Sequence, residues 1–324
     1  FQTFTTEIFS EFKFDPAAAS ALSIPLVLLG LLVLGGEAAI PRRGQLSRSG
    51  PQARRSARRI QLGARTIPTL AGLTALVGLS IGVPIGTLIY WITRSQHSTL
   101  PATATVGAAT VATVTYSALG AVCAVALALP VAILVVRRPS VPSVLLERST
   151  YVTQALPGVV IALSLVFFAI RYAYGLYQTS FLLVAAYTVL HFPLALICVK
   201  SSVAQAPPRL GDVGRSLGRS PAYVFARITV PLVAPGLVAG FCLVFLTAAT
   251  ELTATLVLAP TGVQTLATQF WAYQSEASYG AAAPYALVIV ALAAVPGALL
   301  GLWFDRDGRA ARQEQPIANE VSSR

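Results

Sequence analysis

The sequence is poor in charged residues, and what it lacks already excludes several classes of protein. Only 11% of its 324 residues are Asp, Glu, Lys or Arg, whereas 55% are hydrophobic and the mean hydropathy is +0.71. Soluble globular domains carry about 25% charged residues. The chain has no methionine, two histidines and three cysteines. This composition excludes a soluble globular domain and predicts a membrane protein.

The scarce residue types also exclude common catalytic sites. Neither Lys13 nor Lys200 lies in a glycine-rich phosphate-binding loop, so the chain is not expected to hydrolyse ATP itself. His97 and His191 have no carboxylate close by in the sequence, which argues against a hydrolase site. The cysteines lie far apart in separate apolar runs, without the spacing of a zinc site or a disulfide framework. We expect no catalytic residue, no metal site and no cofactor.

Seven apolar runs are long enough to cross a bilayer as helices. A hydrocarbon core about 30 Å thick requires about 20 helical residues. The runs lie at residues 17–34, 69–92, 113–136, 152–170, 181–199, 230–250 and 281–304. The sequence therefore predicts an all-α polytopic membrane protein.

Lys and Arg residues fall almost entirely on one side of these spans. Connection 37–66 carries eight, 137–148 three, 200–227 five and the tail after Phe304 four. The opposite side has only Lys13, Arg94 and Arg171. Positive residues near span ends stay in the cytoplasm, so we expect the linker and the C-terminus to be cytoplasmic in a bacterial inner membrane. The net charge of +11 follows from this topology, and no nucleic-acid partner is expected.

An internal repeat connects the start of the chain with a segment near its end. Residues 1–9 align with 263–271, with Gln, Thr and Thr identical at the second, third and sixth positions, and Ala-Ala-Ala at 17–19 matches 281–283. Both copies run from a polar segment through an apolar span to a charged exit. With no initiator methionine, we expect a C-terminal fragment of a protein with about twelve spans. The expected parts are the end of a first repeat (1–35), an Arg-rich cytoplasmic linker (36–66), a second repeat of six spans (67–305) and a cytoplasmic tail (306–324).

The most specific motif lies in the cytoplasmic connection between the fifth and sixth runs. Asp212 is followed six positions later by Gly218, Ile228 comes ten positions after that glycine, and Pro231 follows. This spacing resembles the coupling loop of permeases of binding-protein-dependent ABC importers, a type I importer fold. The family pattern is an acidic residue, two alanines, the glycine and Ile-x-Leu-Pro. This chain departs from it in having Asp for Glu, Val-Gly for the two alanines and Val for Leu.

The residues of this loop also predict its shape. We expect Asp212, Arg215 and Arg219 on one face of a short helix, a turn at Gly218, and a second segment starting after Ser220. Such a two-helix projection is suited to pushing on another protein. The resemblance implies docking of this loop on an ATPase subunit and pairing of Asp212 with a basic residue there. The implied coupling residues are Asp212, Gly214, Arg215, Gly218, Pro221, Ile228 and Pro231.

Glu251 is the one acidic residue that the sequence places within or at the end of an apolar run. An ionised carboxylate in hydrocarbon is costly, so it should face a water-filled path or a partner. Its segment resembles Glu-Leu-Pro-Ala-Thr-Leu of the iron(III) importer permeases, with Thr253 in place of Pro. The carboxylate with the hydroxyls of Thr250 and Thr253 would give a cation transient oxygen contacts along a translocation path. The alternative is that Glu251 only caps the outer end of a helix.

These resemblances imply a permease subunit of an ABC importer, for iron(III) first and thiamine next. The implied partners are a pair of ABC ATPase subunits, an extracytoplasmic substrate-binding protein, the first permease repeat and the lipid bilayer. In such importers the binding protein does most of the substrate selection. A secondary transporter would explain the repeat and Glu251, but it has no need of the 212–231 pattern.

Overall fold

The computed structural model describes residues 66–95 and 100–313, together with residues 7–8, 11, 18, 21–25, 27–30 and 32. All regular secondary structure in the two long ranges is helical. In chain order the elements are α3 (Thr66–Val77), π-helix η2 (Gly78–Gly82), α4 (Val83–Arg94), α5 (Thr103–Arg137), α6 (Val141–Ala155), α7 (Gly158–Tyr172), 3-10 helix η4 (Tyr174–Leu176), α8 (Ser180–Gln205), α9 (Pro208–Ser216), α10 (Pro221–Val224), π-helix η5 (Phe225–Thr229), α11 (Val230–Ala249), α12 (Thr253–Leu258), α13 (Leu266–Ser275) and α14 (Tyr279–Gln313). The predicted all-α class is confirmed.

Five helices in these ranges are long and apolar enough to span a membrane. They are Thr66–Arg94, Thr103–Arg137, Ser180–Gln205, Pro221–Ala249 and Tyr279–Ala298. Each overlaps one of the predicted spans, and several extend beyond the apolar run. Of the predicted span at 17–34, the structure describes residues 18, 21–25, 27–30 and 32, which are helical. The first copy of the repeat (1–9) falls largely outside the described residues, as does the linker (36–66) except for Thr66, where α3 begins.

The predicted span at 152–170 differs from the observed structure. It is divided between α6 and α7, which are bent by 106° at the break between them. Leu156 is extended, with φ −90° and ψ 134°, as expected for a residue before proline, and Pro157 begins the turn into α7. The expectation of one straight helix here is wrong, because hydropathy reports composition and not direction.

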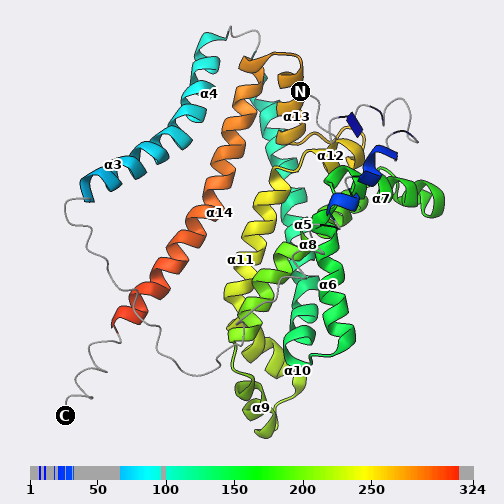
Figure 1. Ribbon diagram of the computed structural model, residues 1–324, viewed down its shortest axis with the longest axis vertical. Coiled ribbons are helices and arrows are strands. Elements are labelled where there is room, and N and C mark those ends of the chain that lie inside the picture. Colours follow the sequence, from blue (N-terminus) through cyan, green and yellow to red (C-terminus); the bar gives the residue numbers. More distant parts are fainter. Residues whose placement is uncertain are drawn as a thin grey trace.

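Helices α5, α8 and α11 form the central core, side by side along most of their length (Figure 1). Small side chains allow this close packing, because they let helix backbones approach each other. The fully buried core residues include Ala121, Ala124, Ala128 and Ala132 of α5, Ala195, Leu196 and Val199 of α8, and Val233 and Val244 of α11.

The closest approach between α8 and α11 occurs at Gly236. A Cβ atom there would clash with the Ser202 side chain and lie 2.7 Å from the Cys198 carbonyl oxygen. The Gly236 N–H donates to Ser202 Oγ at 3.2 Å, and this hydroxyl donates to the Val233 carbonyl at 3.3 Å. The ends of α8 and α11 that flank the predicted coupling loop are therefore fastened to each other.

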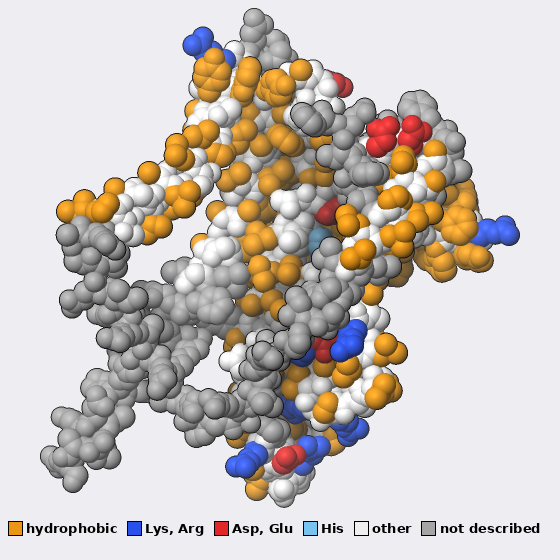
Figure 2. Space-filling model, viewed as in Figure 1, with side chains coloured by type: hydrophobic (Ala, Val, Ile, Leu, Met, Phe, Trp, Pro, Cys, Tyr) orange, Lys and Arg blue, Asp and Glu red, His pale blue; other side chains and the backbone are white. Residues whose placement is uncertain are grey.

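The two ends of the bundle differ in structure. Helices α9 and α10 form a projection at one end, and α12 and α13 lie at the opposite end (Figure 1). Hydrophobic side chains cover much of the visible flanks of the spans, whereas several exposed Lys and Arg side chains gather at the end that carries the projection (Figure 2). At the opposite end, Thr265 and Thr268 form a reciprocal cap on α13, and the Leu266 N–H donates to Thr113 Oγ1 of α5 at 2.8 Å.

Candidate functional site

The projection begins with α9 and reverses at Gly218. Gly218 has φ +77°, a left-handed conformation that glycine adopts without steric cost. Its N–H donates to the Arg215 carbonyl at 2.9 Å, and the Arg219 N–H donates to the Gly214 carbonyl at 3.2 Å. These two bonds are those of a Schellman motif, which ends a helix and turns the chain. The predicted turn at Gly218 is confirmed.

The returning limb packs closely on α9. Ser220 caps α10, its Oγ accepting from the Tyr223 N–H at 3.3 Å, with Pro221 in the first helical position. A Cβ atom on Gly214 would lie 2.9 Å from Ile228 Cδ1 and 3.1 Å from Val224 Cγ2. Small residues in α9 therefore allow the two limbs to close into one body, which we call the knob (residues 208–229).

The charged residues of the knob are arranged differently from the prediction. Asp212 and Arg215 form an exposed ion pair within α9, with Oδ1 and Nη2 2.6 Å apart. Arg219 does not share their helix face, because it follows the Gly218 turn; its guanidinium lies 5.0 Å from the centre of the Tyr223 ring. Exposed ion pairs contribute little to stability, so Asp212 and Arg215 can exchange partners at low cost.

The knob also exposes apolar side chains. Leu217, beside the turn, is 75% exposed, and Leu210 and Val213 of α9 are exposed as well, outside the spanning helices. Tyr223 and Phe225 are exposed at the start of the span Pro221–Ala249. Exposed apolar residues on a segment such as α9 that projects from the spans are typical of a protein-binding surface.

Glu251 lies at the other end of α11, in the three-residue connection to α12. Its Oε1 accepts hydrogen bonds from Thr253 Oγ1 at 2.7 Å and from the Ala254 N–H at 3.1 Å. The carboxylate therefore caps α12, as the structural alternative requires. Thr253 is brought to the carboxylate, but Thr250 is not: its hydroxyl donates to the Leu246 and Thr247 carbonyls of its own helix.

Several helices meet around Glu251. A Cβ atom on Gly158, the first residue of α7, would lie 2.8 Å from Thr253 Oγ1 and 3.4 Å from Glu251 Oε1. The Glu251 carbonyl accepts from Thr255 Oγ1 at 2.7 Å, and this hydroxyl is 2.6 Å from the hydroxyl of buried Tyr187 on α8. Within the described ranges, no group of three or more His, Cys, Asp and Glu residues is placed to hold a metal ion.

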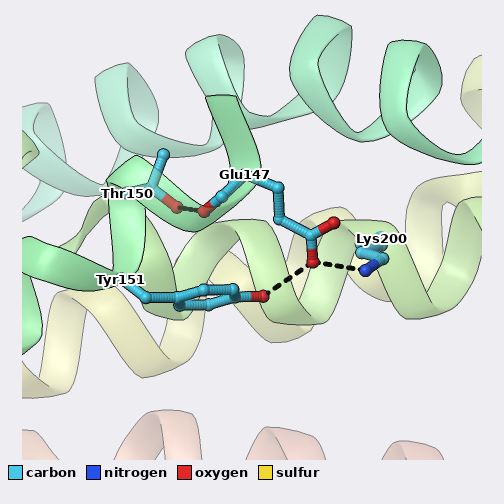
Figure 3. Close-up of polar contacts among 4 residues, drawn as sticks. All are labelled: Glu147, Thr150, Tyr151 and Lys200. Atoms are coloured by element: carbon cyan, nitrogen blue, oxygen red, sulfur yellow. Dashed lines mark hydrogen bonds and ion pairs between the residues drawn. The ribbon is translucent and has the colours of Figure 1, made fainter. Parts of the chain in front are cut away.

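A polar contact between α6 and α8 is not predicted by the sequence. Glu147 Oε1 is ion-paired with Lys200 Nζ and accepts a hydrogen bond from Tyr151 Oη at 3.0 Å (Figure 3). Glu147 is only 9% exposed. Both charged residues were assigned to cytoplasmic connections, although each lies inside a helix. The only available signal was that one of the two lysines borders an apolar run.

The sequence of this chain matches the model of a known family. A family model described as "Binding-protein-dependent transport system inner membrane component" matches residues 124–306, more than half of the chain. The chain belongs to this permease family. The match includes the knob and runs from α5 into α14, and it establishes the type I importer permease fold that the sequence predicted.

Two curated relatives belong to transport systems. The chain is 38% identical over 306 residues to the Fe(3+)-transport system permease protein FbpB 2 of Haemophilus influenzae, covering 93% of this chain and 60% of that protein. It is 34% identical over 123 residues to a probable molybdenum ABC transporter permease protein of Haloferax volcanii, covering 38% of this chain and 45% of that one. The chain thus spans less than two thirds of either relative.

A solved structure of the MetNI methionine ABC transporter in inward-facing conformations also matches. The identity is 17%, the match covers 62% of this chain and 93% of the other, and the TM-score is 0.45. The permease assignment rests on the family match alone.

Proposed function

We propose that this chain contains the second permease repeat of a bacterial ABC importer and that its knob is the coupling loop that docks an ATPase subunit. The observation that carries the proposal is the knob itself: two closed limbs, a glycine turn, and exposed apolar and ion-paired side chains. The proposed division is the one expected from the sequence, with a first-repeat end (1–35), a linker (36–66), this repeat (67–305) and a cytoplasmic tail (306–324).

The proposed mechanism is alternating access driven by a pair of ATPase subunits. Closure of the two subunits on ATP would draw the coupling loops together and open the path toward a loaded extracytoplasmic binding protein. The Gly236–Ser202 contact suits this role, because it ties the helices on both sides of the knob. A force on the knob would then move α8 and α11 as a pair. A secondary transporter would need no such projection.

Leu217→Asp tests the docking proposal. Leu217 is 75% exposed, so the change should not unfold the chain, but it places a charge in the proposed apolar contact. We expect less ATPase to co-purify and ATP-driven uptake to fall about tenfold or more. The control is Val141→Asp, an 84% exposed residue at the same end of the bundle but outside the knob. Equal ATPase recovery and uptake in both variants would refute the docking role.

We further propose iron(III) as the substrate, with thiamine as the second candidate. The support is the printed name of the Haemophilus influenzae relative together with the oxygen ligands at Glu251 and Thr253. Hard, highly charged cations prefer such oxygens. Uptake of radiolabelled iron(III), undiminished by excess thiamine or molybdate, is the expected result. Thiamine uptake without iron uptake would reject this choice while leaving the importer proposal standing.

Glu251 and Thr253 are proposed to border the translocation path near its outer end, with Thr250 one residue away. Their position at the end of α11 opposite the knob is consistent with an outer gate (Figure 1). A single carboxylate would offer a passing cation a contact without trapping it.

A further inference from the structure

Glu147 and Lys200 connect α6 with α8, the helix that leads into the knob. Glu147 lies in the middle of α6, and Lys200 lies near the C-terminal end of α8, which ends at Gln205. Glu147 is 9% exposed, and its carboxylate has two partners, Lys200 and Tyr151 (Figure 3). The Lys200 side chain is 34% exposed, so Glu147 is the buried member of the pair. Burying a charge is costly unless it is paired, so removal of Lys200 leaves the charge of Glu147 strongly disfavoured.

The α8 side of the pair leads directly into the knob. After Gln205, only Ala206 and Pro207 precede α9, and Ala206 is buried. Ser202, in the same last part of α8, is the residue that contacts Gly236 of α11. Lys200 therefore lies in the last part of α8, which is joined to α11 through Ser202 and leads into the knob; we call this part the base of the knob.

The α6 side of the pair leads to the opposite end of the bundle. α6 ends at Ala155, and after the bend at Leu156 and Pro157 the chain continues at Gly158, which lies close to Thr253 and Glu251. One helix thus contacts the base of the knob through Glu147, and its continuation contacts the segment proposed to border the outer gate.

We propose that Glu147 and Lys200 are a positioning pair that makes α6 follow the knob, so that movement at α9 and α10 reaches the Gly158–Glu251 contact. The inference rests on the proposed ATP-driven importer function and adds a specific mechanical connection to it. Apolar side chains allow helices to slide past each other, whereas an ion pair with a buried carboxylate and a second hydrogen bond holds one position along the helix axis. The pair therefore transmits displacement in both directions.

The test uses the full transporter, reconstituted in vesicles with its ATPase and binding protein, in which ATP hydrolysis and substrate uptake are measured together. Glu147→Gln and Lys200→Met each remove one charge. We expect both variants to hydrolyse ATP but to transport several-fold less substrate per ATP. The exchanged pair Glu147→Lys with Lys200→Glu should recover most of the wild-type ratio, because it restores opposite charges.

Arg148→Gln is the matched control, since Arg148 is adjacent to Glu147 but exposed. Its uptake per ATP should equal that of the wild type. If Glu147→Gln and Lys200→Met assemble and keep the wild-type ratio, the positioning role is overturned while the importer function stands. If the wild type shows no ATP-driven uptake, the proposed function fails and this inference fails with it.

Tyr151→Phe covers the case in which the two charge variants do not assemble. It removes one hydrogen bond to Glu147 and keeps both charges. A lowered uptake per ATP in this variant, with normal assembly, supports the positioning role. A wild-type ratio in Tyr151→Phe assigns the pair to assembly alone and overturns the proposal.

Discussion

At the scale of single residues, the hydrogen bonds of Glu251 give it a structural role, and its proposed contact with a passing cation is a separate question. Its Oε1 caps α12 through Thr253 and Ala254, so a structural contribution is present. The charge itself is not required for that cap, because an amide oxygen would accept the same bonds. A charge-neutral substitution therefore separates capping from any contact with a cation.

We expect Glu251→Gln to assemble normally and to lower iron(III) uptake about tenfold, because the amide keeps the shape and acceptor but loses the charge. Uptake and the amount of assembled complex are measured together. Thr253→Val is the companion variant, since it removes the hydroxyl donor and leaves the charge. Unchanged uptake in an assembled Glu251→Gln complex would exclude a charge-based role, and loss of complex would favour the structural one.

Gly218→Ala should destabilise the turn of the knob by about 1 kcal/mol, because a left-handed φ is unfavourable for a residue with a Cβ atom. No atom lies within 4 Å of the added Cβ, so the effect is confined to the backbone. The effect of this destabilisation on docking is measured as the amount of ATPase subunit that co-purifies with the permease. Gly175→Ala, also with open space around it but without a positive φ, should have no effect. Equal recovery in both variants would contradict the proposed importance of the turn.

The sequence predicted the residues of the knob better than it predicted buried partners. Gly218 could be identified because the turn is local and the spacing to Ile228 is fixed. Arg219 was placed wrongly, because the same turn takes it off the helix that carries Asp212 and Arg215. The Glu147–Lys200 pair joins residues far apart in sequence, and such pairing depends on helix packing that a count of charges does not contain.

At the scale of elements, the contact between α8 and α11 depends on the absence of a side chain at Gly236. We expect Gly236→Ala to destabilise the solubilised complex by about 1–3 kcal/mol, as overpacking does in other cores. Gly240→Ala is the control, because its Cβ would be 3.4 Å from the nearest atom, Val125 Cγ2, an ordinary contact. Thermal denaturation of both variants measures the difference.

The second variant for this contact is Ser202→Gly combined with Gly236→Ala. Removing the serine side chain relieves one of the two clashes of the new methyl group, while the Cys198 carbonyl oxygen stays 2.7 Å away. The double variant should therefore recover part of the stability that Gly236→Ala loses. If the two changes are additive, the clash with the Ser202 side chain is not the cause of the destabilisation.

Two of the three identical residues in the internal repeat have a physical explanation. Thr265 and Thr268 form the reciprocal cap that starts α13. The matching positions at the start of the chain also carry threonine, at the same spacing. The repeat therefore keeps threonine at the two positions whose hydroxyls form the cap of α13. The bend at Pro157 is the opposite case: a strong sequence signal, an uninterrupted apolar run, gave no indication of the change of direction between α6 and α7.

At the scale of the whole molecule, the distribution of charge predicts the orientation. We expect cysteines introduced at Ser49, Ser220 and Ser322 to be protected from an impermeant thiol reagent in intact cells. A cysteine at Gly175, between α7 and α8 at the opposite face, should be labelled. The background lacks Cys123, Cys198 and Cys242. Labelling at Ser49 or Ser322 from outside would reverse the topology.

The first spanning helix of the described range has no buried side chain within the molecule. Over Thr66–Arg94 most apolar residues are exposed, and only Ile85, Leu88 and Ile92 are half-buried. Backbone polar groups are satisfied within the helix, so lipid can cover such a surface, as can further helices. Lipid and the proposed first repeat are the partners we expect there.

The π-helix at Phe225–Thr229 limits how much the length of the knob can vary between relatives. A π-turn holds one more residue than an α-helical turn. Deleting a single residue from this segment would return it to α-helical geometry and rotate everything on its N-terminal side by about 100° around the axis of α11. Leu217 and the Asp212–Arg215 pair would then face away from their original direction without any change in their own sequence. The loop should therefore accept substitutions far more readily than insertions or deletions between Gly218 and Pro231, where length sets the direction in which the knob points.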